Sequence, residues 1–306
     1  MANDVTLIAL GGNALKSSEG KRNFQDFPEL SKACASMSGF EPGTLVVTHG
    51  NGPQIGNLVQ SLGSDERRSL DVLGAETEGL LGYQIEQELS NSLQNSDRVI
   101  TLLTRVEVDR DDPAFAEPTK PIGPWLSADD AQRSAREHNW QFTEYKGKYR
   151  RIVPSPRPEK IIQVDAIRDL LHSGYNVICA GGGGIPVSRS GTGGRIGVEA
   201  VIDKDHASSL LARQLGVRTL YLVTDVNGVY NDWDTPDESL LQSTTPDELR
   251  AMKLPTGSMG PKAEAACDFV EATGNAACIG ALAQLEELLH QDAGTWIKEN
   301  LKRSEA

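Results

Sequence analysis

The stretch VTLIALGGNAL, residues 5–15, decides the fold class of this chain. Its first part, Val5–Leu10, is a short apolar run that predicts a buried strand. Gly11, Gly12 and Asn13 follow it directly. Glycine at the end of a strand allows positive φ, or lets another group come close to the backbone. The stretch therefore predicts a strand whose carboxyl end meets a tight turn, a packed helix or a phosphate.

Short apolar runs and helical patterns alternate along the rest of the chain. Further strands are predicted at Thr44–Thr48, Arg98–Leu103, Asn176–Ala180, Thr219–Thr224 and Ala276–Ile279. Helices are predicted at Glu29–Ser38, Pro53–Leu62, Gly74–Leu93, Val164–Ser173, Asp205–Leu215, Pro246–Met252, Pro261–Thr273 and Gln284–His290. Continuous apolar strands that alternate with helices are typical of an α/β fold with a mostly parallel sheet. In such sheets, ligands bind beyond the carboxyl ends of the strands.

Two segments depart from this rhythm. Residues 109–158 are rich in proline, charge and aromatic side chains, and they are too long for a plain connection. We expect an inserted protruding subdomain or lid there, within a single domain that spans residues 1–306. The segment SRSGTGGRIG, Ser188–Gly197, predicts a mobile surface loop.

The composition excludes several classes of protein. The chain has 306 residues, 38% of them hydrophobic, which is enough for a large core. Its formal net charge is −13, whereas nucleic acids and anionic membranes are bound by concentrated Lys and Arg. No secretion signal and no run of about 18 apolar residues is evident. We therefore expect a cytoplasmic protein that binds neither nucleic acid nor membrane.

The chain lacks the common catalytic and metal-binding motifs. It has no GxxxxGK[ST] loop, no GxGxxG after the first strand, and no HRD, DFG, GxSxG or HExxH sequence. The four cysteines are far apart and form no CxxC pair, so we expect reduced thiols in the core. Of the five histidines only His49 lies in a motif, where a structural role is the more ordinary interpretation.

Three glycine-rich turns follow predicted strands: Gly11–Asn13, the HGNGP sequence at His49–Pro53, and the AGGGGIPV sequence at Ala180–Val187. Each places backbone N–H groups at the carboxyl end of a strand, and two lead toward helix N-termini, where the dipole favours anions. One such turn alone is as easily explained by local geometry. Three that meet at one edge of a sheet indicate a site for phosphate or another anion.

Three lysines lie on turns framed by Gly, Pro or Asp: Lys120 in PTKPIGP, Lys204 in VIDKDHAS, and Lys262 in GSMGPK. Asp203 and Asp205 flank Lys204 and suit the start of a helix. Lys262 is opposed by the dipole of its own helix, so it needs another partner. Phosphoryl transfer requires cations around a transition state whose negative charge is spread over several oxygens. No general base is evident, which fits an acceptor that is already an anion, such as a carboxylate or carbamate.

These motifs occur together in one order: ALGGNAL, THGNGPQIGNL, DVLGAETEGLLGY, EPTKPIGPW, KYRRIVPSPRP, GGGGIPV, GVEAVIDKDHAS and GSMGPKAEAA. In this order they resemble the carbamate kinases of the amino acid kinase family, over residues 5–297. The pair PTKPIGP and VEAVIDKD, at this separation, carries most of the resemblance.

The resemblance implies a three-layer α/β/α sandwich with a mostly parallel central sheet and a small protruding subdomain, usually in a homodimer. It implies an ATP-dependent phosphotransferase that moves a phosphoryl group reversibly between ATP and carbamate, giving ADP and carbamoyl phosphate, with Mg²⁺ as cofactor. The family commonly works in arginine metabolism, in the direction of ATP.

The resemblance also implies three groups of site residues. The substrate and the transferred phosphoryl group would be held by Gly11, Gly12, Asn13, Gly50, Asn51 and Gly52. The catalytic residues would be Lys204 and Lys262, which neutralise the phosphates, Lys120 from the subdomain, and Asp203, which orients the lysines. The nucleotide would be bordered by Thr224, Asp225 and Trp233, within LVTDVNGVYNDW, and by Met259. No protein ligand to a metal is assigned.

The chain departs from the family pattern at Lys16–Phe27, Glu76, Glu78, Arg189, Arg195 and His206. Two alternatives stay open. One is a relative that phosphorylates another small carboxylate or phosphate acceptor, because fold does not determine substrate. The other is a non-catalytic nucleotide-binding protein, which would bind ATP tightly without turnover.

Overall fold

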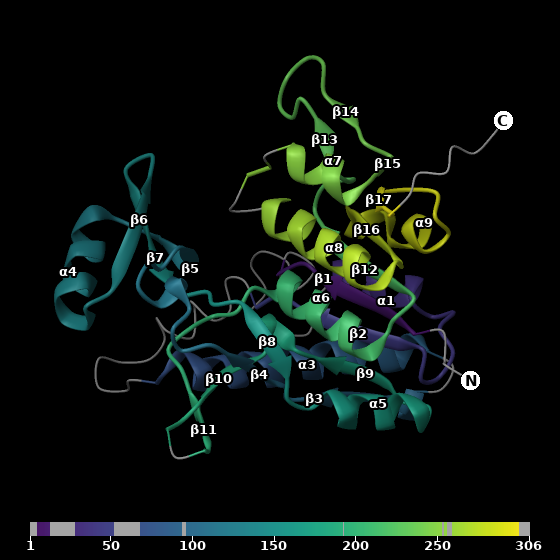
Figure 1. The fold of residues 1–306 in the computed structure, drawn as a ribbon, viewed down its shortest axis with the longest axis horizontal. Coiled ribbons are helices and arrows are strands. Elements are labelled where there is room, and N and C mark those ends of the chain that lie inside the picture. Colours follow the sequence, from purple (N-terminus) through teal and green to yellow (C-terminus); the bar gives the residue numbers. More distant parts are fainter. Residues whose placement is uncertain are drawn as a thin grey trace.

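The computed structural model describes residues 5–12, 28–51, 68–93, 96–191, 193–252, 254–255 and 259–299. Its largest sheet has eight strands in the order β15-β17-β16-β12-β1-β2-β9-β3 (Figure 1). Their bounds are Thr6–Leu10 (β1), Leu45–His49 (β2), Val99–Leu102 (β3), Asn176–Cys179 (β9), Thr219–Thr224 (β12), Ser243–Thr244 (β15), Ala276–Ala281 (β16) and Thr295–Ile297 (β17). All neighbouring pairs are parallel except β16 with β17. The predicted mostly parallel sheet is confirmed.

Strand β1 shows why helices cover both faces of this sheet. Leu7 and Ala9 belong to the core on one face, with helices α5 (Val164–His172), α6 (Lys204–Leu215) and α8 (Met259–Thr273). Ile8 and Leu10 belong to the core on the other face, with α1 (Pro28–Ser36), α3 (Leu70–Ser92) and α9 (Leu285–Leu289). Successive side chains of a strand point to opposite faces, so an uninterrupted apolar strand needs cover on both. The result is the predicted three-layer α/β/α sandwich.

A second sheet, in the order β11-β10-β4-β8, was not predicted from the sequence. Its strands are Arg105–Val108 (β4), Pro158–Ile161 (β8), Ile185–Arg189 (β10) and Arg195–Gly197 (β11). The predicted mobile loop at Ser188–Gly197 is wrong at its two ends, because β10 and β11 pair as an antiparallel hairpin. Arg189 and Arg195 both bind the carboxylate of Glu107, at 3.0 and 2.6 Å, and fix the hairpin to β4.

A third sheet stands apart from the sandwich, at the left of Figure 1. It consists of β5 (Lys120–Leu126), β7 (Lys148–Val153) and β6 (Gln141–Tyr145) in that order, with helix α4 (Ala128–His138) beside it. Ile122 and Val153 of this unit form a small apolar cluster with Leu70, Leu73 and Val201 of the body. The unit lies within the segment where we predict a subdomain, and its movement as a lid stays a prediction.

The six predicted strands are all present, with ends shifted by one or two residues at most. Helix α3 begins four residues before its predicted start at Gly74, because the carboxylate of Glu199 accepts the backbone N–H of Leu70 and supports an earlier first turn. Helix α7 (Pro246–Ala251) and the hairpin of β13 (Tyr230–Asn231) with β14 (Ser239–Leu240) complete the elements used below. The predicted helix at Pro53–Leu62 lies outside the described residues.

The prediction for the cysteines is confirmed. Cys34, Cys179, Cys267 and Cys278 are buried and free. Burial raises the pKa of each thiol above its ordinary value, which keeps the thiols unreactive. Among the helices of the described ranges, none is both long and apolar enough to cross a membrane.

Candidate active site

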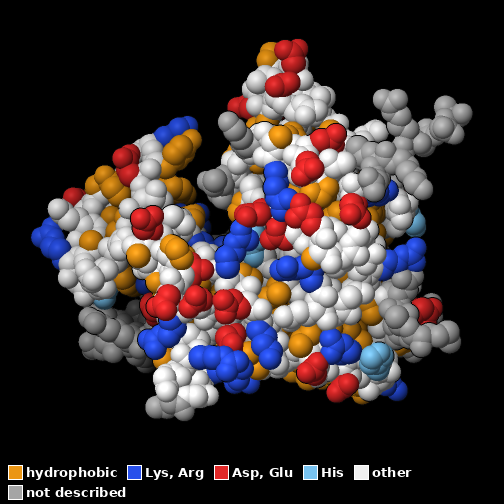
Figure 2. Space-filling model, viewed as in Figure 1, with side chains coloured by type: hydrophobic (Ala, Val, Ile, Leu, Met, Phe, Trp, Pro, Cys, Tyr) orange, Lys and Arg blue, Asp and Glu red, His pale blue; other side chains and the backbone are white. Residues whose placement is uncertain are grey.

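Two adjoining cavities lie at the carboxyl ends of the central strands. The larger, of about 610 Å³, and the smaller, of about 230 Å³, share the lining residues Gly12, Lys204 and Lys262. Gly12 follows β1, Lys204 begins α6, and Lys262 is in the first turn of α8. Figure 2 shows the surface hollowed between the unit of β5, β6 and β7 and the part that carries α7 and α8. Three of the predicted site residues therefore lie where the two cavities meet.

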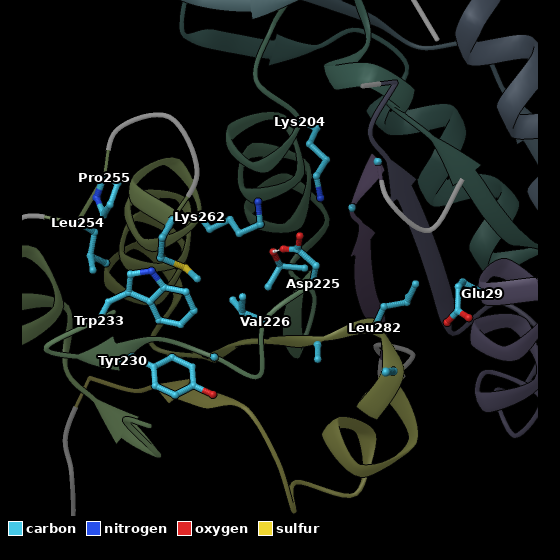
Figure 3. Close-up of a pocket in the computed structure, with 17 residues that line it drawn as sticks. Glu29, Lys204, Asp225, Val226, Tyr230, Trp233, Leu254, Pro255, Lys262 and Leu282 are labelled. Carbon is cyan, nitrogen blue, oxygen red and sulfur yellow. Dashed lines mark hydrogen bonds between the residues drawn. The ribbon is translucent and has the colours of Figure 1, made fainter. Parts of the chain in front are cut away.

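The larger cavity has an apolar wall with two aromatic rings. Trp233 and Tyr230 lie nearly edge to face, with ring centroids 5.1 Å apart (Figure 3). The wall also includes Val226, Leu254, Pro255, Met259 and Leu282. A concave apolar wall of this kind suits the base of a nucleotide. The residues predicted to border the nucleotide all line this cavity: Thr224, Asp225, Trp233 and Met259.

Helix α6 begins at the junction of the cavities because Asp203 caps it. Oδ1 of Asp203 accepts the backbone N–H groups of Asp205, at 2.9 Å, and His206, at 3.4 Å. Oδ2 of Asp203 binds Nζ of Lys120 at 2.7 Å, so this lysine reaches from β5 to the start of α6. Burial opposes the charge of Asp203, but the Lys120 ammonium, together with His206 and the backbone N–H of Asp205, holds the pKa of that carboxyl below its usual range. The cap is therefore ionised and orients Lys120.

Asp205 lies between the other two lysines. Its Oδ1 is 3.1 Å from Nζ of Lys204, and its Oδ2 is 3.2 Å from Nζ of Lys262, with the side chain only 4% exposed. Nζ of Lys204 also donates to the backbone carbonyl of Ala9 in β1 at 3.2 Å. Burial lowers the pKa of Lys204, and the carboxylate of Asp205 counteracts this. The partner that Lys262 was expected to need is thus Asp205, and Figure 3 shows both lysines reaching into the cavity.

Asp205 is not among the site residues predicted from the sequence. The available signal was its position beside Lys204, on the side opposite Asp203. The two carboxylates pair with different lysines: Asp203 pairs with Lys120, and Asp205 pairs with Lys204 and Lys262.

The three glycine-rich turns meet at the smaller cavity, which is lined by Gly12, Gly50, Asn51 and Gly182. A Cβ on Gly50 would lie 3.2 Å from the backbone nitrogen of Gly12. Gly182 has a φ of 66°, and a Cβ there would overlap the side chain of Asn51. Glycine is needed at these positions because the turns approach so closely. The predicted convergence is confirmed; Gly11 lines the larger cavity, whereas Asn13 and Gly52 lie outside the described residues.

Two buried titratable groups, Glu78 and His49, lie beneath the turns, and neither is among the site residues predicted from the sequence. Glu78 of α3 accepts the backbone N–H groups of Thr104 and Gly181, at 3.2 and 3.0 Å. Burial raises the pKa of Glu78 to about 8, so its carboxyl is mostly protonated at neutral pH. Burial lowers the pKa of His49 to about 4, and its Nδ1 donates to the carbonyl of Gly50 at 3.0 Å. Glu78 and His49 are therefore largely uncharged near neutral pH. Glu78 also holds the start of the turn at Gly181 through its hydrogen bond.

The carboxylates of the smaller cavity fit Mg²⁺ carried by a nucleotide. Within the part of the chain that the structure describes, no three or more His, Cys, Asp or Glu side chains form a metal-binding group. In kinases Mg²⁺ is bound mainly by the substrate phosphates and needs only one or two protein carboxylates. Asp203 and Asp205 line the smaller cavity beside its junction with the larger one and meet this requirement.

Comparison with known proteins identifies the family. The model of the Amino acid kinase family matches residues 4–280. The chain belongs to this family. It is 44% identical to the carbamate kinase of Rhizobium meliloti, over 96% of this chain and 93% of that protein. It is 43% identical to the carbamate kinase of Haemophilus influenzae, over 95% of this chain and 96% of that protein.

Solved structures of the amino acid kinase family agree with this assignment. Carbamate kinase from Giardia lamblia bound to AMP-PNP is 33% identical to this chain, with a TM-score of 0.85, over 98% of this chain and 99% of that one. The same enzyme bound to citric acid is 32% identical, with a TM-score of 0.85. The family match includes every predicted site residue, from Gly11 to Lys262.

Proposed function

We propose that this chain catalyses the reversible transfer of a phosphoryl group between ATP and carbamate, giving ADP and carbamoyl phosphate. The observation that carries the proposal is the meeting of two cavities at Lys204 and Lys262. The aromatic cavity suits the nucleotide, and the small polar cavity suits an acceptor of few atoms. Similarity to carbamate kinases over nearly the whole chain supports carbamate as that acceptor.

The residues at the junction act through charge and position. Lys204 and Lys262 neutralise the charge that spreads over the phosphoryl oxygens as the bond to ADP breaks and the bond to the acceptor forms. Lys120 adds a third cation from the acceptor side. Carbamate is already an anion, so its oxygen attacks phosphorus without losing a proton and requires no general base. Donor and acceptor sit on opposite sides of the junction, which favours in-line transfer.

Mg²⁺ enters this account with the nucleotide. When bound, it would neutralise further charge on the phosphates. Asp203 and Asp205 are the residues that would hold the ion or its bound waters, in addition to their work of placing the lysines.

We also propose a cytoplasmic homodimer that works in arginine metabolism, as the family resemblance implies. The dimer is supported by helix α3, on which Val72, Leu80 and Tyr83 are 43%, 38% and 63% exposed at helical spacing. Leu103 is 47% exposed and lies near the same helix, with its Cδ2 3.9 Å from the position of a Cβ added at Gly79. An exposed apolar face of this kind commonly marks a protein interface. Sedimentation equilibrium tests the dimer, and a monomer at micromolar concentration would contradict it.

The alternative is a relative that phosphorylates another small carboxylate or phosphate acceptor. The test compares carbamate, acetate, glutamate and inorganic phosphate as acceptors, with ADP release followed by a coupled assay. We expect turnover with carbamate to exceed the others by about a hundredfold or more, because a polar site rejects acceptors that leave its groups unpaired. Faster turnover with another acceptor would favour the alternative, and ATP binding without turnover would favour a non-catalytic protein.

A further inference from the structure

The smaller cavity contains a fourth cation, Arg150, that the proposed function has not used. Arg150 lies on β7 and lines this cavity together with Lys120, Gly50 and Asn51. The described residues that line the larger cavity do not include it. Arg150 therefore belongs to the acceptor half of the cleft, on the side away from the nucleotide.

Arg150 differs from the other cations of the cleft in its partners. Each of the three lysines pairs with Asp203 or Asp205. Across the described ranges, no carboxylate forms an ion pair with Arg150, and its one hydrogen bond runs from Nε to the carbonyl oxygen of Gly123 at 2.7 Å. Within the same ranges, the terminal nitrogens Nη1 and Nη2 have no acceptor. An arginine that lines a polar cavity without a counter-charge is suited to bind an anionic ligand.

The neighbouring Arg151 shows how a purely structural arginine is used in the same strand. Its Nη2 lies 3.4 Å from Oε1 of Glu199, and its guanidinium carbon is 4.0 Å from the centre of the Trp140 ring. Glu199 also accepts the backbone N–H of Leu70 at the start of α3. Arg151 thus joins the β5–β7 unit to the body, and Arg150 makes no comparable contact in the described part of the chain.

The local backbone holds the Arg150 guanidinium in place. The register of β5 with β7 is interrupted between Ile122 and Leu126, and Gly123 within the interruption has a φ of 73°. The carbonyl of Gly123 therefore lies outside the strand pairing and accepts Nε of Arg150, while the guanidinium carbon lies 5.9 Å from the centre of the Trp125 ring. Burial lowers the pKa of Arg150, but arginine titrates so far above neutrality that the group stays charged. The cation is thus fixed before any ligand binds, which reduces the entropy lost on binding.

We propose that Arg150 binds the acceptor, by donating N–H groups from its terminal nitrogens to the planar carboxylate-type group of carbamate. This inference rests on the proposed function. The contact is made to the oxygen that does not attack phosphorus, which becomes the carbonyl oxygen of carbamoyl phosphate. A planar guanidinium matches a planar carboxylate in shape and charge, whereas Lys120 acts as a point charge. Arg150 therefore orients carbamate for attack.

Two variants of the full chain test this role: Arg150→Met, which keeps the apolar stem, and Arg150→Lys, which keeps the charge without the planar fork. Kinetics are measured with ADP and carbamoyl phosphate, and in reverse with ATP and carbamate from ammonium bicarbonate. In Arg150→Met we expect the KM for carbamate to rise by about tenfold or more, as for a lost hydrogen bond to a charged group. The KM for carbamoyl phosphate rises less, because its carbonyl is uncharged. The KM values for ADP and ATP stay unchanged, and Arg150→Lys recovers only part of the loss.

Arg136→Met is the matched control, because Arg136 is an exposed arginine on α4 of the same unit and should leave all four KM values unchanged. An unchanged KM for carbamate in Arg150→Met, or an equal rise in the KM for ATP, would overturn the role of Arg150. Circular dichroism checks the folding of both variants. If Arg150→Met does not fold, the KM values for carbamate and ATP are compared in Arg150→Lys instead. The activity of the wild type separates the two proposals. If the wild type is active and both Arg150 variants keep its KM values, only the role of Arg150 is refuted. If the wild type has no activity, both the proposed function and the role of Arg150 are refuted.

Discussion

The carboxylate of Asp205 binds the ammonium group of Lys262, Oδ2 to Nζ at 3.2 Å, although the two residues are 57 positions apart in the chain. This contact joins the start of α6 to the first turn of α8. Because Asp205 also pairs with Lys204, both lysines stay at the junction of the cavities. Two ammonium groups that share one carboxylate would repel each other without it. We therefore expect Asp205 to keep both cations available to a phosphoryl group.

Replacement of this carboxylate tests the arrangement of the lysines. In Asp205→Asn we expect kcat to fall by more than about tenfold, because the cations that stabilise the transition state lose their fixed positions. Asp292→Asn, an exposed aspartate on the protein surface, is the control and should retain full kcat. Retention of full activity in a folded Asp205→Asn variant would show that the lysines are held in some other way.

Lys120 supplies the cation that comes from the β5–β7 unit. We expect Lys120→Ala to reduce kcat by more than about tenfold, through loss of charge at the acceptor side of the junction. Lys120→Arg should restore only part of it, because a guanidinium cannot occupy the position of the ammonium against Asp203. Lys160→Ala, at an exposed lysine of β8, should be nearly silent. Wild-type kcat in Lys120→Ala would remove this lysine from the mechanism.

The aromatic wall of the larger cavity predicts an effect confined to the nucleotide. Trp233 is 56% exposed and its ring packs near that of Tyr230. We expect Trp233→Ala to raise the KM for ADP by about tenfold, and Trp233→Phe to raise it less, because stacking on the base depends on ring area. The KM for carbamoyl phosphate should not change in either variant. If the KM for carbamoyl phosphate rises while that for ADP does not, the assignment of the two cavities is reversed.

Glu78 predicts a dependence of stability on pH. Its pKa is about 8 in the folded protein, against an ordinary value of 4.5. The folded protein therefore keeps this proton to higher pH than the unfolded chain. The contribution of Glu78 to the free energy of unfolding is greatest below pH 4.5 and falls as the pH rises toward 8, with a slope of at most about 1.4 kcal/mol per pH unit.

The variant Glu78→Gln isolates this contribution. An amide oxygen can still accept the N–H groups of Thr104 and Gly181, but it does not titrate in this range. In urea unfolding between pH 5 and 8, we expect the variant to lose less stability than the wild type as the pH rises. Glu76→Gln, on the same helix but paired with Arg68 at the surface, is the control. Parallel stability curves for Glu78→Gln and the wild type would mean that Glu78 is not protonated in the folded state.

The central sheet and the glycine-rich turns could be predicted because their signals are local. Strand β1 is apolar at every position that faces either core, and glycine follows where backbone must approach backbone. The second sheet could not be predicted in this way. β4 pairs with β8, which follows some 50 residues later, and β8 is an edge strand that begins with a proline, a weak strand signal. Such pairing depends on tertiary contacts that no short window of sequence contains.

The three lysines of the predicted site could be singled out for a similar reason. Lysines framed by glycine, proline or aspartate stand out in the sequence, and the structure brings Lys120, Lys204 and Lys262 to one cleft. The roles of Asp205 and Glu78 depend on which groups face them from distant elements. Asp205 resembles an ordinary residue at the start of a helix until Lys262 is placed beside it. In the sequence, Glu78 resembles a surface glutamate. Only the structure shows that its carboxyl accepts the backbone N–H of Gly181.

The central claim is that Lys204 stands where a phosphoryl group passes between ADP and carbamate. The most direct measurement is the formation of ATP from ADP, Mg²⁺ and carbamoyl phosphate by the wild type and by Lys204→Ala, with circular dichroism of both proteins. We predict rapid ATP formation by the wild type and a loss of more than about tenfold in kcat for the folded variant. A folded wild type that binds ADP but forms no ATP from carbamoyl phosphate, or a Lys204→Ala variant with full activity, would contradict the account.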